Sequence, residues 1–227
     1  MFVSRSMTRQ VITADPDAGI FDAQELMHAN DIRHLPVVEK DNKLVGIVTD
    51  RDIRSALPYS FFKKSLDAAE KEKIGELRVK DIMSPKPISV SPTYTIQDAL
   101  MVIQDSKVGA LPVVDQDGKV TGIISVRDLL RAFINVLGIG EPGTLLCILV
   151  EEQVGQLKKI VDTITAENIS FGSVLVARYW DEDKRAVFTY LLTLNVAQVK
   201  KKLEKIGFTL LDPMQWYLDQ LPKNEPA

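Results

Sequence analysis

The chain has 227 residues, 45% of them hydrophobic and 26% charged, with a formal net charge of −3. This composition is typical of a soluble globular protein, and no global positive charge draws the chain to nucleic acid or to an anionic membrane. The single cysteine, Cys147, excludes an intramolecular disulfide and a thiol-rich zinc site, and its apolar neighbours predict that it is buried. Because no apolar run approaches the roughly 20 residues of a membrane span and the first ten residues lack a secretion signal, we expect a cytoplasmic protein.

A repeat organises the first half of the chain. The segment that begins at Ile32, IRHLPVVEKDNKLVGIVTDRDIR, returns at Val108 as VGALPVVDQDGKVTGIISVRDLL, 76 residues later. Residues 7–56 align with residues 83–132 without a gap, and 17 of the 50 aligned positions are identical. Chance would give only a few identities, so the first half is a duplication.

Each copy predicts the same order of elements, β-α-β-β-α. A short strand (residues 11–13 and 87–90) precedes a helix, a hairpin follows, and a second helix begins near Asp50 or Arg127. The apolar positions of the first helix recur at helical spacing, at Ile20, Ala23, Leu26 and Met27 in one copy and at Ile96, Ala99, Leu100 and Ile103 in the other. One copy of about 50 residues buries too little surface to be stable alone, so we expect the two copies to share a core.

Both hairpins end in the same motif, Gly46-Ile-Val-Thr49-Asp-Arg51-Asp52 in the first copy and Gly122-Ile-Ile-Ser125-Val-Arg127-Asp128 in the second. The glycine lets a ligand or a facing backbone approach closely, and the hydroxyl residue stands at a helix start, where free N–H groups favour phosphate. The carboxylate can accept hydrogen bonds from both hydroxyls of a ribose, and the arginine can meet a phosphate. The same spacing is also a simple helix cap, and capping alone is the alternative interpretation.

Two copies of this motif, each preceded by the sequence LPVV, resemble the cystathionine-β-synthase (CBS) domain, and the pair over residues 2–135 resembles a Bateman module. The resemblance implies a regulatory sensor that binds ATP, ADP, AMP or derivatives such as S-adenosylmethionine in clefts between the copies, with no metal required. The candidate nucleotide-binding residues are Thr13, Ile32, Arg33, His34, Pro36, Thr49, Arg51, Asp52, Ser89, Val108, Ala110, Pro112, Ser125, Arg127 and Asp128. The alternative function is an interaction or dimerisation scaffold with no small-molecule ligand.

The surroundings of the motif differ between the copies. Arg33 and His34 precede LPVV in the first copy, where the second has glycine and alanine, and Asp50 of the first motif is replaced by Val126. The basic residues favour ligands with more phosphates at the first site, and Asp50 would offset part of that gain. We therefore expect one site to bind tighter than the other, by about tenfold.

No motif indicates catalysis. The sequence contains no nucleophile elbow, no HExxH zinc motif, no Walker loop and no glycine-rich dinucleotide fingerprint, and it has only two histidines. We predict that the chain is not an enzyme and that it has no catalytic or metal-ligating residues.

The second half predicts a different module. Its predicted elements follow the order β-α-β-β-α-β of a ferredoxin-like plait. They are a strand over 144–150, a helix after Gly155, strands over 169–180 and 185–195, a helix over 196–207 and the strand FTLL. The inward positions of its helices are expected to be Leu157, Ile160, Val161 and Ile164, then Val199, Leu203 and Ile206. This order resembles the ACT domain, which implies an amino-acid site at the loop of Glu152, Val154, Gly155 and Leu157. Val154 stands where the ACT signature has a proline, and the alternative is a domain that only dimerises or docks a partner.

The fold class is therefore α+β, in five parts: repeat 1 (1–57), a charged linker (58–80), repeat 2 (81–138), an ACT-like domain (143–212) and a tail (213–227). This architecture resembles that of the bacterial acetoin-utilisation accessory proteins. Because edge strands and apolar helix faces occur in both halves, we expect a homodimer or larger symmetric assembly. We also expect a regulated protein partner, and no binding to nucleic acid or membrane.

Overall fold

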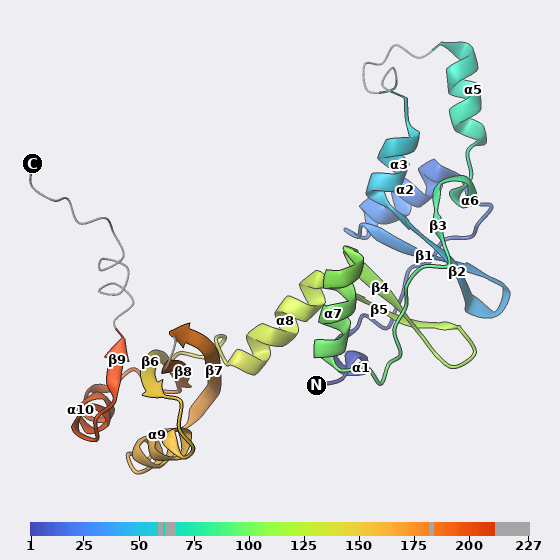
Figure 1. Ribbon diagram of the computed structural model, residues 1–227. Coiled ribbons are helices and arrows are strands. Elements are labelled where there is room, and N and C mark those ends of the chain that lie inside the picture. Colours follow the sequence, from blue (N-terminus) through green and yellow to red (C-terminus); the bar gives the residue numbers. More distant parts are fainter. Residues whose placement is uncertain (59–60, 62–66, 182–183, 212–227) are drawn as a thin grey trace, which may run out of the picture. The chain divides into compact units, whose positions relative to one another are not determined.

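The computed structural model describes residues 1–58, 61, 67–181 and 184–211. The chain divides into two compact units, Met1–Ala132 (unit 1) and Phe133–Ala227 (unit 2), and Figure 1 labels their helices and strands. The division falls within helix α8 (Val126–Leu137). No helix among the described residues is long and apolar enough to cross a membrane.

Unit 1 contains the two copies, and the duplication is visible in its hairpins. The first copy comprises α2 (Ile20–Ala29), β1 (His34–Glu39), η1 (Lys40–Asn42), β2 (Lys43–Thr49) and α3 (Asp50–Ala56). The second comprises α7 (Ile96–Ser106), β4 (Ala110–Val114), β5 (Val120–Ser125) and α8. Each hairpin is antiparallel in the same register, Val37 opposite Gly46 and Val113 opposite Gly122, with an irregularity directly after the valine. The predicted hairpins and helices are thus confirmed.

The N-terminal segments of the two copies are exchanged. Helix α1 (Val3–Ser6) precedes the first copy but packs on the second, where the Val3 N–H donates to the Tyr94 carbonyl at 2.8 Å. Helix α6 (Val79–Ile82) precedes the second copy but packs on the first, where the Val79 N–H donates to the Ala18 carbonyl at 2.9 Å. Val3 and Val79 are fully buried, so each copy is completed by a segment of the other.

This exchange corrects the predicted first strands. Residues 11–13 and 87–90 form no strand, and only Ala14 and Val90 make isolated parallel bridges, to Val37 and Val113. Residues 8–14 pass from the second copy, where Thr8 bridges Ile123, to the first copy, where Ala14 bridges Val37. A chain that crosses between two hairpins within six residues cannot stay beside either strand long enough to form a ladder.

The linker is partly helical and packs on the first copy. Helix α5 (Ala68–Glu76) lies within residues 58–80, and its Ile74 is buried with Ile20 and Leu57. The short strand β3 (Ser84–Pro85) then pairs with β2. The sequence predicted a charged, helix-prone linker here and missed its buried contact.

The core of the first copy lies between its hairpin and its helices. Leu35 and Val48 of the hairpin are fully buried with Ala23 of α2 and Ile53 of α3. Leu26 was expected to face this core but is exposed, because the buried positions Ile20, Ala23 and Met27 define a narrower face of the helix.

The glycines of the motif have a role that differs from the predicted one. A Cβ at Gly46 would lie 3.0 Å from Cγ of Met83 and would overlap its Sδ, and a Cβ at Gly122 would meet Met7 in the same way. The methionines come from the exchanged segments. The absent Cβ therefore admits a thioether side chain that holds the two copies together, rather than a ligand.

Unit 2 has the predicted order β-α-β-β-α-β. Its elements are β6 (Thr144–Glu151), α9 (Gln156–Thr165), β7 (Phe171–Asp181), β8 (Lys184–Leu191), α10 (Ala197–Lys205) and β9 (Thr209–Leu211). All three strand pairings are antiparallel, in the order β7-β8-β6-β9. This is the strand order of a ferredoxin-like plait. The predicted tail, 213–227, lies outside the described residues.

The helices of unit 2 cover one face of this sheet. Ile148 of β6, Ile160 and Ile164 of α9 and Leu203 of α10 are fully buried together. Leu157 and Ile206, also predicted inward, are exposed instead, because each lies at the end of its helix and beyond the sheet-facing positions.

Cys147 of β6 is buried, as predicted. Burial raises the pKa of its thiol above the ordinary value of 9.0, because the thiolate loses hydration. The thiol therefore stays protonated at neutral pH and behaves as a small apolar side chain.

Candidate functional site

Unit 1 contains two open cavities, one at each motif. The Ser125 cavity, of about 490 Å³, is lined by Ser125, Arg127 and Asp128 of the second copy together with Thr8, Gln10–Ile12 and Ile32–His34 of the first. The Thr49 cavity, of about 740 Å³, is lined by Thr49, Arg51 and Asp52 of the first copy together with Ser84–Ile88 and Lys107–Ala110 of the second. Both volumes suit a small-molecule ligand, and each cavity needs residues of both copies.

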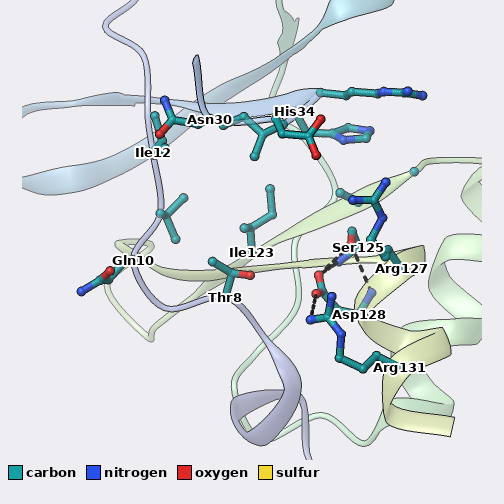
Figure 2. Close-up of a pocket in the computed structure, with 16 residues that line it drawn as sticks. Thr8, Gln10, Ile12, Asn30, His34, Ile123, Ser125, Arg127, Asp128 and Arg131 are labelled. Atoms are coloured by element: carbon teal, nitrogen blue, oxygen red, sulfur yellow. Dashed lines mark hydrogen bonds and ion pairs between the residues drawn. The ribbon is translucent and has the colours of Figure 1, made fainter. Parts of the chain in front are cut away.

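The Ser125 cavity has an apolar side and a charged side. Figure 2 shows Ile12 and Ile123 on one side, and Ser125, Arg127 and Asp128 on the other. A ligand with an apolar ring and an anionic group would find a matching surface for each part.

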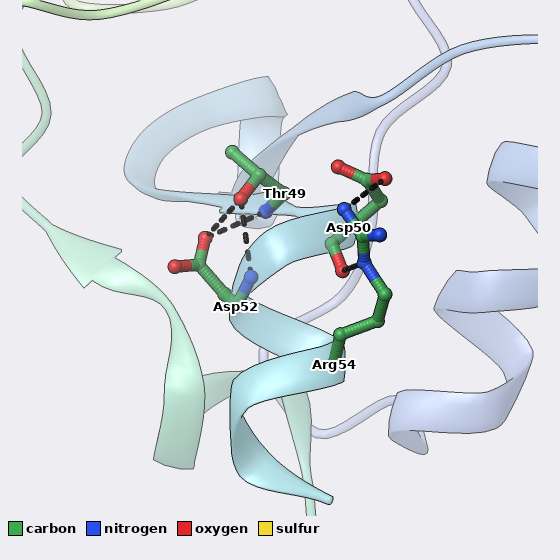
Figure 3. A network of polar contacts seen from close by, with 4 residues as sticks. All are labelled: Thr49, Asp50, Asp52 and Arg54. Atoms are coloured by element: carbon green, nitrogen blue, oxygen red, sulfur yellow. Dashed lines mark hydrogen bonds and ion pairs between the residues drawn. The ribbon is translucent and has the colours of Figure 1, made fainter. Parts of the chain in front are cut away.

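The hydroxyl and the carboxylate of each motif form a complete capping box. Ser125 Oγ donates to Asp128 Oδ2 at 2.7 Å, the Ser125 N–H donates to the same oxygen at 2.9 Å, and the Asp128 N–H returns to Ser125 Oγ at 3.3 Å. In the first copy, the corresponding distances for Thr49 and Asp52 are 2.7, 2.8 and 3.2 Å (Figure 3). The predicted capping role is therefore present in both copies.

Capping uses one oxygen of each carboxylate. Oδ2 is the capping atom in both, and Oδ1 of Asp128 lies 3.6 Å from Arg131 Nη1. Among the described residues, none donates a hydrogen bond to Oδ1 of Asp52 or forms an ion pair with it. The second oxygen of each aspartate thus leaves a carboxylate acceptor at the cavity wall, so capping and ligand binding are compatible.

Eleven of the fifteen predicted residues line a cavity. Ile32, Arg33, His34, Ala110, Ser125, Arg127 and Asp128 line the Ser125 cavity, and Arg33, His34, Thr49, Arg51, Asp52, Val108 and Ala110 line the Thr49 cavity. Thr13, Pro36, Ser89 and Pro112 line neither. The two prolines are buried within β1 and β4, and the other two residues directly precede the isolated bridges that turn the chain away.

The sequence prediction missed the exchanged segments as cavity walls. Gln10 and Ile12 line the Ser125 cavity, and the equivalent Lys86 and Ile88 line the Thr49 cavity. Arg131, at the charged side in Figure 2, was also missed. The 76-residue offset relates the two segments, but it does not indicate that each faces the other copy's motif.

His34 lies in the wall of both cavities. Its ring packs on Gly109, where a Cβ would lie 2.7 Å from Nε2. Burial lowers the pKa of His34 below its ordinary value of 6.5, the negative charges of Asp50 and Asp52 oppose this shift, and Arg33 adds to it. The imidazole is therefore neutral at neutral pH.

The predicted ACT loop lies in unit 2 between β6 and α9. Gly155 has the left-handed φ of 94° directly before the helix, which favours glycine, and Val154 is fully exposed. Glu152 forms an ion pair with Arg185 of β8. The structure thus places these residues on one exposed turn with the carboxylate of Glu152 already paired.

Duplicated repeats that complete each other and form two cavities with both apolar and charged walls define a tandem-repeat module. The family model for the CBS domain matches residues 3–59 and 79–135, so the chain belongs to the CBS-domain family. The resemblance expected from the motif is thereby confirmed for the first half of the chain.

Two relatives illustrate how far the similarity extends. A CBS domain-containing protein of Dictyostelium discoideum is 32% identical over 137 residues, which cover 60% of this chain and 94% of the relative. Inosine-5′-monophosphate dehydrogenase of Korarchaeum cryptofilum is 36% identical over 121 residues, but these are 53% of this chain and only 22% of the enzyme. The match to the enzyme is confined to its CBS region, and no catalytic family is indicated.

Solved structures show the same fold over 59% to 63% of this chain. CBSX2 from Arabidopsis thaliana is 30% identical, with a TM-score of 0.52 over 59% of this chain and 94% of that one, and CBSX2 has also been solved in complex with AMP. A Vibrio cholerae structure that carries the name acetoin utilization protein (AcuB) is 32% identical, with a TM-score of 0.52 over 63% of this chain and 98% of that one.

Proposed function

We propose that this chain is a non-catalytic regulatory sensor that binds an adenosine nucleotide, AMP, ADP or ATP, in the two cavities of unit 1. The observation that carries the proposal is the wall of the Ser125 cavity, which sets two isoleucines opposite Asp128 and two arginines. The AMP complex of CBSX2, a related structure at 30% identity, supports the same ligand class.

Each part of the nucleotide has a matching group. Ile12 and Ile123 offer an apolar surface for the base, and Oδ1 of Asp128 offers an acceptor for ribose hydroxyls. Arg127 and Arg131 supply positive charge for the phosphate. The Thr49 cavity repeats this arrangement with Ile88, Asp52 and Arg51.

We further propose that unit 2 is an ACT-like regulatory module and that the chain forms a homodimer. The β-α-β-β-α-β order and the glycine before α9 support an ACT-like module. Met101 and Leu130 are exposed on α7 and α8 of unit 1, as expected of helix faces that pair with a second copy. Sedimentation at tens of micromolar tests the dimer, and a monomer would contradict it.

The chain contains a matched control that separates ligand binding from capping. Asp98 forms the same capping box with Thr95 but lines neither cavity. Thr95 Oγ1 and the Thr95 N–H donate to Asp98 Oδ2 at 2.7 and 2.9 Å, and the Asp98 N–H donates to Thr95 Oγ1 at 3.1 Å. Asp52→Ala, Asp128→Ala and Asp98→Ala should therefore lose the same cap, whereas only the first two should lose a ribose acceptor.

Calorimetric titration with AMP and ATP provides the measurement. We expect one site to be lost or weakened at least tenfold, or about 1.4 kcal/mol, in Asp52→Ala and in Asp128→Ala, and no change in Asp98→Ala. If all three variants bind like the unsubstituted protein, the aspartates are caps only and the proposal is wrong. Incubation with ATP should give no product, and turnover would overturn the non-catalytic assignment.

A further inference from the structure

The two cavities differ in charge far more than their shared motif suggests. The Thr49 cavity is lined by Arg33, Arg51, Arg54, Lys86 and Lys107, against the carboxylates of Asp50 and Asp52. The Ser125 cavity is lined by Arg33, Arg127 and Arg131, against Asp31 and Asp128. The larger cavity is therefore also the more basic one.

Two pairs of equivalent positions are enough to account for this difference in charge. At the 76-residue offset, Lys86 corresponds to Gln10, and Lys107 corresponds to Asp31. The first pair replaces a neutral amide by a cation, and the second replaces a carboxylate by a cation. Neither lysine belongs to the motif, and each reaches the Thr49 cavity from the second copy.

The backbone supports a direct comparison at the second pair. Lys107 has the left-handed φ of 55° at the end of α7, and Asp31 has φ of 50° at the equivalent place after α2. The two residues share an uncommon backbone conformation. Replacing each by the residue type of the other therefore alters the charge and requires no change in the backbone.

The acidic residue that would oppose these lysines is already paired. Asp50 Oδ2 accepts from Arg54 Nη2 at 3.0 Å, one turn along α3 (Figure 3). The ion pair removes Asp50 and Arg54 together from the charge available to a ligand. Arg33, Arg51, Lys86 and Lys107 then face a single carboxylate, Asp52.

We infer that the Thr49 cavity binds a nucleoside di- or triphosphate, whereas the Ser125 cavity binds a nucleoside monophosphate. This assignment rests on the proposed function and adds the phosphate number at each site. A longer phosphate chain needs more room and more positive charge, and the Thr49 cavity offers both, about 740 Å³ against about 490 Å³ and two additional lysines.

The test uses proteins that keep one cavity each. Asp128→Ala should weaken binding in the Ser125 cavity and keep the Thr49 cavity functional, and Asp52→Ala should do the reverse. Each variant is titrated with ATP and with AMP in a calorimeter. We expect the Asp128→Ala protein to prefer ATP by about tenfold and the Asp52→Ala protein to prefer AMP or to show no preference.

Reciprocal substitution at the equivalent positions then tests whether the two lysines cause the preference for ATP over AMP. Lys86→Gln with Lys107→Asp in the Asp128→Ala protein should abolish the preference for ATP, and Gln10→Lys with Asp31→Lys should create one in the Asp52→Ala protein. Lys40→Gln with Lys73→Glu has the same effect on net charge outside both cavities and should leave the preference unchanged. Circular dichroism checks that each variant is folded.

A competition experiment needs no lysine variant. Inorganic tripolyphosphate should displace ATP from the Asp128→Ala protein at concentrations that leave AMP bound to the Asp52→Ala protein. Equal ATP-to-AMP preferences in the two proteins, with tripolyphosphate acting equally on both, would overturn this inference and leave the proposed function intact. If the unsubstituted chain binds neither nucleotide, the proposed function fails and the inference fails with it.

Discussion

The two repeats of unit 1 share their structural contacts and differ in their cavity walls. Their capping boxes agree within 0.1 Å, 2.7, 2.8 and 3.2 Å against 2.7, 2.9 and 3.3 Å, and each motif glycine admits a methionine of the other copy. At the wall, Lys86 and Lys107 face one cavity where Gln10 and Asp31 face the other. The residues that the repeats have in common therefore make the capping boxes and the contacts between the copies, and the residues in which they differ are those that we propose to set the number of phosphates at each site.

The largest effect on stability is expected for substitutions of the motif glycines, Gly46 and Gly122. Gly46→Val and Gly122→Val should each destabilise unit 1 by about 1–3 kcal/mol, because the new side chain would overlap Met83 or Met7. Urea denaturation followed by circular dichroism measures the loss. Met83→Ala should partly rescue Gly46→Val but not Gly122→Val, and Met7→Ala should do the reverse.

Destabilisation by only one of the two glycine substitutions would show that the two contacts are not equivalent. Rescue of Gly46→Val by Met7→Ala, or of Gly122→Val by Met83→Ala, would show that the rescue does not depend on these contacts. Either result would mean that the two repeats differ in their structural contacts and not only in their cavity walls.

The duplication explains which features the sequence could predict. Identical residues at a constant offset identify the hairpins and the helices after them, and Thr49 and Ser125 were correctly expected at helix starts. The offset establishes which residues are equivalent but not which copy they contact. For this reason the predicted sites lacked the lining residues of the exchanged segments, Gln10, Ile12, Lys86 and Ile88.

Periodicity was less informative at the margins of helices. It predicts that Leu26 and Ile206 are inward, but a helix packed on a hairpin or a sheet buries only a narrow face, and both residues lie outside it. The role of Gly46 was also misjudged, although Met7 and Met83 form a conspicuous equivalent pair in the sequence. A close contact between two segments distant in the chain leaves no local pattern.

The capping boxes should give the next largest effect. Thr49→Ala and Ser125→Ala should each cost about 1 kcal/mol, because the Asp52 or Asp128 N–H loses its side-chain acceptor. Thr95→Ala removes the same cap outside the cavities and should cost about as much. Nucleotide titration of the three variants should show weaker binding for the first two only, and weaker binding for Thr95→Ala would point to an indirect effect of helix fraying.

The ion pair of Asp50 and Arg54 should contribute little to stability. Its side chains are 38% and 60% exposed, so Arg54→Gln should change the free energy of unfolding by less than about 0.5 kcal/mol. It should nevertheless weaken ATP binding in the Thr49 cavity, because the charge of Asp50 is no longer compensated. Adding Asp50→Val, which copies Val126 of the second repeat, should restore the affinity, and a failure to restore it would show that Arg54 itself contacts the ligand.

The smallest effect at neutral pH is expected at His34, which the second repeat replaces by Ala110. Burial, opposed by Asp50 and Asp52, lowers the pKa of His34 in the folded state below the 6.5 of the unfolded chain. As pH falls through 6.5, the unfolded chain takes up this proton first, so the neutral imidazole favours folding above 6.5 and that contribution is lost progressively below it. His34→Gln should therefore leave stability nearly unchanged at pH 7.5 and reduce the loss of stability between pH 6.5 and 5, measured by urea denaturation at each pH. His28→Gln, a substitution of the exposed histidine on α2, is the matched control and should leave that loss in place. An unchanged slope in His34→Gln would mean that other groups cause the acid sensitivity, and that this difference between the repeats has no consequence for folding.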